Sequence, residues 1–198
     1  MRNLAIDGDR LWRSLMEMAE IGATPKGGNA RLALTDLDRQ GRDLFVAWAR
    51  EAGCTVAIDR VGNIFVRRPG RDAGLAAVAT GSHLDTQPTG GRFDGVYGVL
   101  AGLEVVRTLN DHRIETRAPV EVVVWTNEEG SRFSPAIMGS GVFAGIWPPE
   151  EIEDKRDVEG RRFGDELRRI GYAGDMVPGA NQPAAYFEAH IEDRKSVV

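Results

Sequence analysis

Apolar side chains recur every three to four positions in four stretches of the chain, a spacing typical of amphipathic helices. In the first stretch, Leu11, Leu15 and Met18 lie on one helical face. The second begins with a capping residue, Thr35, and ends at Gly53, as glycine often ends a helix. The predicted helices cover residues 7–23, 35–53, 94–111 and 162–174.

Runs rich in β-branched and apolar residues lie between these helices. The segments "LAAVATGSH" and "APVEVVVWTNEE" are almost continuously apolar before they turn polar, which predicts strands covered on both faces. Two shorter runs, 54–59 and 63–69, meet around Gly62, a hairpin signal. A last strand-like run covers 184–192, whereas 145–160 is polar and is expected to be a loop.

Buried strands that alternate with helices predict an α/β fold. We expect a three-layer sandwich around a mixed, mostly parallel sheet. No internal repeat or interdomain linker is visible, which predicts a single domain.

Composition narrows the classes of protein that fit. The 198 residues carry a net charge of −5 and no basic block, which argues against nucleic-acid binding. Cys54 is the only cysteine, so no disulfide can form within the chain. The first residues lack the apolar core of a signal peptide, and no run approaches membrane-spanning length. These features predict a cytoplasmic protein.

Three predicted strands end in polar clusters, which read "GSHLD", "TNEEG" and "EAHIE". Ligands bind at the carboxyl ends of strands in open α/β sheets, so these clusters should converge. They supply His83, His190 and several carboxylates, and Asp94 adds another just before a predicted helix. Such a mixed nitrogen and oxygen set suits zinc, manganese or cobalt.

Each of these residues also has a purely structural interpretation. A lone loop histidine is usually no ligand, but Asp85 follows His83 by two positions, and on an extended segment it would lie on the same side and support the ring. Asp94 is equally compatible with a helix cap. The glycines around it, such as Gly95, allow a close backbone approach that a cap does not require.

The adjacent acids Glu128 and Glu129 are the most informative pair. On an extended backbone their side chains would point in opposite directions, so that one binds metal while the other serves as a general base. The alternative is an exposed acidic turn. His112 lies in a helix-end loop and is expected to be a surface histidine.

The segments "GSHLDTQPTGGRFDGVYGVLAGLEVVRTL", "VWTNEEGSRFSPAIMGSGVFAG" and "FEAHIE" together resemble the dinuclear-zinc amidohydrolases. This group includes N-carbamoyl-L-amino-acid hydrolases, β-ureidopropionases and allantoate amidohydrolases, within the aminoacylase and carboxypeptidase clan. The resemblance implies hydrolysis of the C–N bond of N-carbamoyl amino acids, with release of amino acid, ammonia and CO2. The first alternative is allantoate as the substrate. The second is a fragment that binds a metal or small molecule without catalysis.

The resemblance also implies roles for individual residues. Asp94 would bridge two divalent ions, zinc or else manganese, cobalt or nickel. His83 and His190 would complete one metal site, and Glu129 would bind the other metal. Glu128 would be the general base, and Asp85 would support the His83 site. Arg132 and Phe133, just past the acid pair, would help to shape the substrate pocket.

The chain departs from the pattern that the resemblance implies. Members of the group are about twice as long, carry a lid and dimerisation domain that is absent here, and use one more histidine for the second metal. The segment "HIEDRKSVV" leaves the pattern at Asp193. The resemblance therefore implies that residues 1–192 are the N-terminal portion of an incomplete metal-dependent catalytic domain and that residues 193–198 are a non-family tail. We therefore expect a truncated chain with an incomplete second metal site. It would have little activity alone and would tend to associate through its uncovered sheet edge, whereas the full-length form would be a homodimer.

Overall fold

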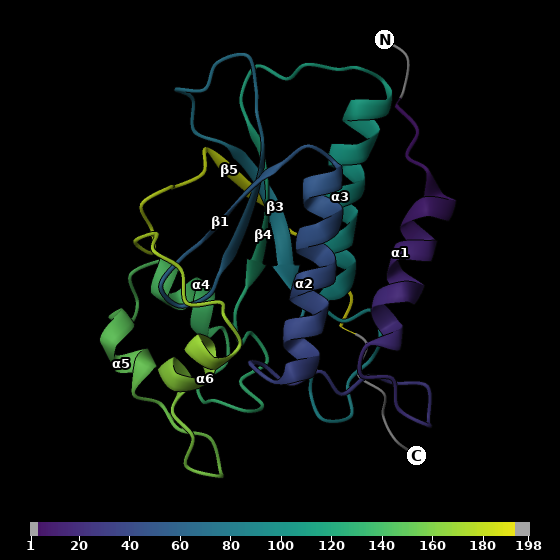
Figure 1. Cartoon of the computed structure of the whole chain (residues 1–198). Helices are drawn as coiled ribbons and strands as arrows, with labels where there is room; N and C mark the ends of the chain where they lie inside the picture. Colours follow the sequence, from purple (N-terminus) through teal and green to yellow (C-terminus); the bar gives the residue numbers. More distant parts are fainter. Residues whose placement is uncertain (1–3, 193–198) are drawn as a thin grey trace.

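The computed structural model describes residues 4–192, which form a five-stranded sheet with helices packed on it (Figure 1). Helices α1, α2 and α3 stand together on one side of the sheet, at the right of the view, whereas α4, α5 and α6 gather at the lower left (Figure 1). The helices are α1 (Gly8–Glu20), α2 (Asp36–Glu51), α3 (Val96–Asp111), α4 (Met138–Phe143), α5 (Pro149–Glu153) and α6 (Phe163–Arg169). The strands are β1 (Thr55–Ile58), β2 (Ile64–Arg68), β3 (Val78–His83), β4 (Val120–Trp125) and β5 (Ala185–Phe187).

The strand order is β1-β2-β4-β3-β5, and the sheet is mixed. Strands β1 and β2 form the predicted antiparallel hairpin, and β2 also pairs antiparallel with β4. Strand β3 is parallel to both β4 and β5. Because parallel strands end at the same edge, the chain segments that follow β3, β4 and β5 leave the sheet side by side. His83 pairs in register with Trp125 at this edge.

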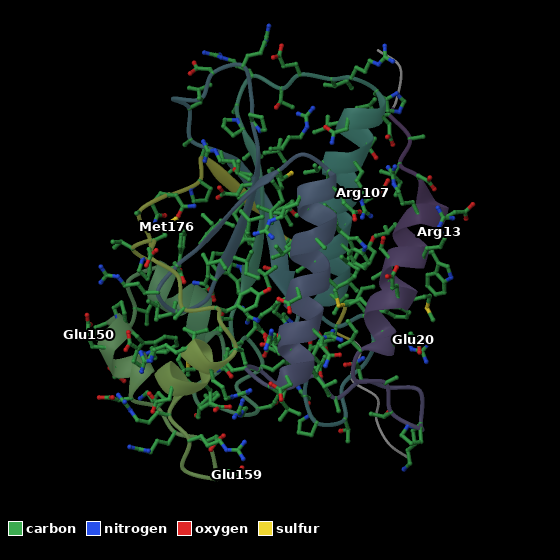
Figure 2. All side chains as sticks on the ribbon, viewed as in Figure 1. Arg13, Glu20, Arg107, Glu150, Glu159 and Met176 are labelled. Atoms are coloured by element: carbon green, nitrogen blue, oxygen red, sulfur yellow. The ribbon has the colours of Figure 1, made fainter. Side chains whose placement is uncertain are left out.

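Helix α3 lies very close to β3 because two of its residues are glycines. A Cβ atom at Gly98 would approach the Cβ of Ser82 to 2.9 Å, and one at Gly102 would approach Thr80 Cγ2 to 2.9 Å. Helix α1 then packs on α3 on the side where Arg107 lies (Figure 2). The Arg107 guanidinium donates a hydrogen bond to Ser14 Oγ of α1 at 2.9 Å. This packing fixes the position of the loop that enters α3 relative to the end of β3.

The main core lies on the helical side of the sheet, where alternate strand residues such as Ile64, Val66 and Val122 are fully buried. The opposite face carries a smaller cluster of Phe65, Ala79, Val123 and Trp125. Phe143 of α4 and Met176 pack against this second cluster. The alternation of the two sets along β2 and β4 follows the period of two in a strand.

The α/β class, the mixed sheet and the four predicted helices are confirmed, with two of the four strand pairings parallel. Thr35 Oγ1 caps α2 by accepting a hydrogen bond from the Asp38 backbone N–H. The loop prediction for 145–160 was wrong in part, because α5 begins there at a proline, Pro149, which suits the first turn of a helix. Helix α4 was not predicted, since six residues with two glycines give little periodic signal. The predicted tail, 193–198, lies outside the described residues.

No helix in the described part of the chain combines the length and the apolar character that crossing a bilayer requires.

Candidate metal centre

His83 ends β3 with its imidazole fully buried. Its Nδ1 lies 2.8 Å from the backbone carbonyl oxygen of Asp85. A carbonyl only accepts, so Nδ1 carries the hydrogen, and in the neutral ring Nε2 presents its lone pair. Nε2 is buried and has no hydrogen-bond partner within the described residues. The ring is therefore oriented, and its free nitrogen points toward acidic groups.

Asp94 is buried beside this nitrogen, with its Oδ1 3.8 Å from His83 Nε2. The interpretation of Asp94 as a helix cap does not hold, because Gly95 occupies the cap position of α3 and no side chain caps that helix. Gly95 has a φ of +66°, and a Cβ atom there would come within 2.3 Å of His83 Nε2. Glycine is thus required for the imidazole to fit against the start of α3.

His190, three residues beyond β5, completes a three-residue group. Its Nε2 lies 3.8 Å from Asp94 Oδ1, and the His83 and His190 ring centroids are 5.6 Å apart. One ligand atom from each of His83, Asp94 and His190 lies within 4.8 Å of the other two. Three segments that are distant in sequence therefore bring two imidazole nitrogens and one carboxylate oxygen together.

The acid pair lies beyond the end of β4 in a segment of turn and bend, so the extended backbone on which opposite directions were expected is not present. The strand ends at Trp125, and Asn127 adopts a left-handed conformation with a φ of +52°. Asparagine tolerates this conformation better than most residues. The turn directs two successive N–H groups at Asp85: Glu128 N–H donates to its Oδ1 at 3.2 Å and Glu129 N–H to its Oδ2 at 3.3 Å.

Both acids consequently face the same pocket instead of opposite sides. The pocket has a volume of about 310 Å³ and is also lined by Asp94, His190 and Gln87. Glu128 Oε2 lies 3.4 Å from His83 Nε2, and its side chain is 28% exposed, which rules out a fully exposed acidic turn. Glu129 Oε2 accepts a hydrogen bond from Gln87 Nε2 at 2.8 Å, while its buried Oε1 has no partner within the described residues.

We call His83, Asp85, Asp94, Glu128, Glu129 and His190 the strand-end cluster. Burial raises the pKa of Glu128, and repulsion from Glu129 adds to it. Burial likewise raises the pKa values of Glu129 and Asp85. Burial lowers the pKa of His83, but the carboxylates of Asp85 and Glu128 outweigh it, and the net shift is upward.

These observations test whether the cluster fits a divalent cation. Within residues 4–192, the ion pairs of Asp94 and Glu128 are made with histidines and not with lysine or arginine. Buried carboxylates without a counter-ion are costly. A divalent metal would balance the charge and give the unpaired His83 Nε2 a partner, and the two-imidazole, one-carboxylate set matches a zinc-type site. The residues fit such an ion.

Three features of the site were missed from the sequence. Gln87 holds Glu129, but a lone glutamine in a loop gives no signal of that contact. Asn127 makes the turn, and the tolerance of asparagine for positive φ is the one signal that could have indicated it. Arg31 is fully buried and donates from Nε to the Leu84 carbonyl at 2.8 Å, which fixes the segment between His83 and Asp85. A buried arginine in a glycine-rich loop is unexpected from composition.

The prediction that Arg132 and Phe133 shape the substrate pocket was wrong. Arg132 instead pairs with Asp157 at 3.1 Å and with Glu166 at 2.6 Å. Phe133 is fully buried and packs edge-to-face on Phe163. The turn after the acid pair sends both side chains into the protein. His112 is exposed at the end of α3, as predicted.

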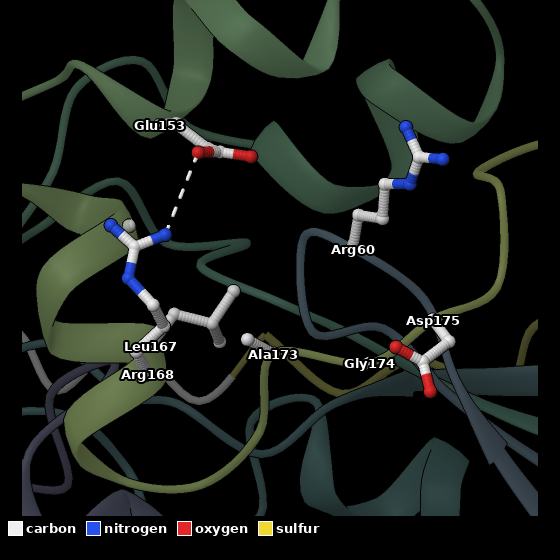
Figure 3. Close-up of a pocket in the computed structure, with 8 residues that line it drawn as sticks. Arg60, Glu153, Leu167, Arg168, Ala173, Gly174 and Asp175 are labelled. Carbon is white, nitrogen blue, oxygen red and sulfur yellow. Dashed lines mark ion pairs between the residues drawn. The ribbon is translucent and has the colours of Figure 1, made fainter.

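A separate pocket of about 300 Å³ lies beside α5 and α6 and is lined by Arg60, Glu153, Arg168 and Asp175, among others (Figure 3). Arg168 pairs with Glu153 there at 3.7 Å. Within residues 4–192, His83, Asp94 and His190 are the only group of three histidine, cysteine or acidic side chains close enough to hold a metal ion. We therefore assign the candidate centre to the strand ends.

The fold and the ligand set together define an α/β domain with a candidate metal centre at its strand ends. The chain belongs to the peptidase family M20/M25/M40, whose model matches residues 79–198. Members of this family are metal-dependent, which agrees with the group of three ligands.

Within this family, the chain is similar to several proteins with known names. The N-carbamoyl-L-amino-acid amidohydrolase of Rhizobium meliloti is 56% identical over 96% of this chain and 46% of its own length. A ureidoglycolate hydrolase of Oryza sativa subsp. japonica is 39% identical over 94% of this chain and 40% of its own length. A hydantoinase/carbamoylase family amidase from Burkholderia multivorans has a solved structure with a TM-score of 0.94 and 65% identity. That match covers 95% of this chain and 46% of the solved chain. The chain thus spans about half the length of the relatives it matches.

Proposed function

We propose that the protein carrying this chain hydrolyses N-carbamoyl amino acids with the help of divalent metal. The reaction adds water across the ureido C–N bond and releases the amino acid, ammonia and CO2. The observation that carries this proposal is the buried, unpartnered His83 Nε2, which faces Asp94 and Glu128. The names of the Rhizobium meliloti and Burkholderia multivorans proteins support the carbamoyl substrate.

His83, Asp94 and His190 would hold one metal ion, and Asp94 and Glu129 would contribute to a second. Zinc is the metal we propose, with manganese, cobalt and nickel as the other candidates. Bound divalent metal polarises a carbonyl oxygen and lowers the pKa of water. Because the described residues supply only two ligands to this second site, it would be the weaker one in the isolated chain.

Glu128 is the proposed general base. Its raised pKa makes its carboxylate a better proton acceptor, and its position beside His83 Nε2 places it at the pocket. It would take a proton at Oε2 from the attacking water and return one to the leaving nitrogen. Asp85 keeps Glu128 in position by accepting a hydrogen bond from the Glu128 backbone N–H. Gln87 holds the side chain of Glu129 by donating a hydrogen bond from Nε2 to its carboxylate.

A second substrate is ureidoglycolate, because the Oryza sativa relative carries that name. Ureidoglycolate and allantoate present the same ureido group on a smaller, more polar carbon skeleton. The strand-end cluster by itself does not distinguish these substrates from N-carbamoyl amino acids, because all of them offer the same scissile bond.

Ammonia release by the protein expressed from its complete reading frame tests the proposal. N-carbamoyl-L-amino acids, N-carbamoyl-β-alanine, ureidoglycolate and allantoate are compared with zinc, manganese, cobalt or nickel present. A dipeptide is tested under the same conditions by the release of free amino acid, because its hydrolysis yields no ammonia. Fastest turnover of an N-carbamoyl-L-amino acid supports the proposal. Turnover of the dipeptide alone, or of no ureido compound with any metal, contradicts it.

A further inference from the structure

A second, larger pocket of about 470 Å³ adjoins the candidate metal centre. The two pockets share one lining residue, Glu128, the proposed general base. A group bound in the larger pocket would therefore extend directly from a scissile bond placed at Glu128. Substrate sites of this kind are mostly apolar hollows with a few polar groups that fix orientation.

Three aromatic rings line this pocket, which we call the aromatic pocket. The Trp125 ring centroid lies 5.1 Å from that of Phe143 and 5.9 Å from that of Tyr186. The polar atoms of these rings are engaged with each other: Trp125 Nε1–H donates to the Tyr186 hydroxyl at 2.8 Å, and that hydroxyl donates to Glu188 at 3.1 Å. These contacts hold the rings in place, and the partly exposed Phe143 and Tyr186 offer apolar surface to a ligand while Trp125 is mostly buried behind them.

Ile137 at the edge of this pocket is in an unusual state. It is 48% exposed and has a φ of +52°, a left-handed conformation that is strained for a β-branched residue. Core packing does not account for it, because the side chain is not in the core. Its backbone N–H donates to the Glu128 carbonyl at 2.6 Å. The strained backbone thus presents an apolar side chain beside the proposed general base.

We propose that the aromatic pocket receives the side chain of an N-carbamoyl-α-amino acid and selects bulky apolar side chains. This inference rests on the proposed function and names the substrate class within it. Ile137 and the aromatic rings would cover the apolar side chain. Glu128 and Glu188 also line the pocket and would repel acidic side chains. N-carbamoylglycine, ureidoglycolate and N-carbamoyl-β-alanine place no apolar group there.

The test compares kcat/KM for N-carbamoyl-L-phenylalanine, N-carbamoylglycine and N-carbamoyl-L-aspartate in the protein expressed from its complete reading frame. The phenylalanine compound should exceed the glycine compound by at least about 10-fold, as burial of several methylene equivalents predicts. The aspartate compound should be the poorest of the three. Equal kcat/KM for the phenylalanine and glycine compounds would overturn the proposal.

Ile137→Gly sharpens the test, because glycine adopts positive φ without strain and the fold should survive. The preference for the phenylalanine compound over the glycine compound should fall about 5- to 10-fold. Ile146→Gly is the matched control, since Ile146 is also exposed (62%) but does not line the pocket. An unchanged preference in Ile137→Gly contradicts the inference and leaves the proposed function standing.

A binding measurement distinguishes a failure of the proposed function from a failure of the aromatic-pocket assignment. Calorimetric titration of N-carbamoyl-L-phenylalanine into wild type and Ile137→Gly should show affinity weakened about 5- to 10-fold. If no carbamoyl compound is hydrolysed but this weakening is seen, the proposed function fails and the aromatic pocket stands. If wild type hydrolyses carbamoyl compounds and binding is the same in both proteins, the pocket assignment fails alone.

Discussion

The strand-end cluster and the cluster around Arg132 both place carboxylates in partly buried surroundings, but they balance the charge differently. Around Arg132, Asp157 and Glu166 accept hydrogen bonds from guanidinium groups, and Arg169 adds a second pair to Glu166 at 3.0 Å. Burial raises the pKa values of these two acids, but their hydrogen bonds outweigh it and the net shifts are downward. In the strand-end cluster, the pKa values of Asp85, Glu128 and Glu129 shift upward instead.

This difference in charge balance distinguishes a cluster that stabilises the fold from a cluster that is suited to bind a ligand. A cluster whose buried polar atoms are paired with one another requires no ligand, and its hydrogen bonds and ion pairs stabilise the fold. A cluster that leaves His83 Nε2 and Glu129 Oε1 buried without a partner carries a cost that a ligand can remove. Perturbed carboxylates of the second kind gather at functional sites. Each variant below should therefore affect one cluster and leave the other unchanged.

The largest effect is expected from Glu128→Gln in the protein expressed from its complete reading frame. Turnover should fall about 10²- to 10⁴-fold, because glutamine cannot accept the proton. Metal content, measured by atomic emission, should stay the same. Glu159→Gln, at an exposed acid of the α5–α6 connection (Figure 2), should keep full activity. Normal turnover in Glu128→Gln would remove Glu128 from the mechanism.

Arg132→Ala should destabilise the chain by about 3 kcal/mol, since it leaves the carboxylate of Asp157 without its arginine and leaves Glu166 with Arg169 alone. Urea unfolding measures this change, and zinc affinity of the folded variant should match wild type. Arg13→Ala, at an exposed position of α1 (Figure 2), should change stability by no more than about 0.5 kcal/mol. Equal stability of the two variants would show that the Arg132 cluster is not structural.

Gly95→Ala should damage the metal centre with a smaller cost to the fold. The added Cβ would meet the His83 ring, and alanine at this positive φ adds strain of about 1–3 kcal/mol. Zinc affinity should fall at least about 10-fold by calorimetry. Gly8→Ala is the control, because a Cβ there meets no atom within 4 Å. Unchanged affinity in Gly95→Ala would mean that His83 does not bind the metal.

The smallest effect is a change in pH dependence. The lowered pKa of Glu166 stabilises the fold above its ordinary range, and this contribution is lost as pH falls through the folded value. Between about pH 6 and about pH 3, metal-free wild type should therefore lose more stability than Glu166→Gln, measured by urea unfolding. If Glu166→Gln instead lost more stability than wild type as the pH falls, the pKa of Glu166 would be raised in the folded state and not lowered.

Much of the fold was predictable because periodicity reports burial directly. The pattern of Leu11, Leu15 and Met18 placed α1, and the runs that became β3 and β4 were apolar because both faces are covered. The sequence also indicated that His83, Asp94 and His190 would meet, since parallel strands end at one edge. Pairing of distant segments was thus inferred from strand direction alone.

Local backbone turns and long-range polar contacts were not predictable in the same way. The left-handed Asn127 redirects Glu128 and Glu129 onto Asp85, and a single asparagine does not reveal this. The fate of Arg132 depended on Asp157 and Glu166, which follow it by 25 and 34 positions. Their partners are set by tertiary packing, which no local pattern encodes.

Zinc titration of the metal-free chain, followed by calorimetry, tests the central claim most directly. We predict one tight site in wild type, a much weaker second site or none, and at least about 10-fold weaker binding in His190→Ala, because that substitution removes one of three ligands. No zinc binding to the folded chain, or the same affinity in His190→Ala, would contradict the assignment of the metal centre. Two tight sites of similar affinity would contradict the incomplete second site.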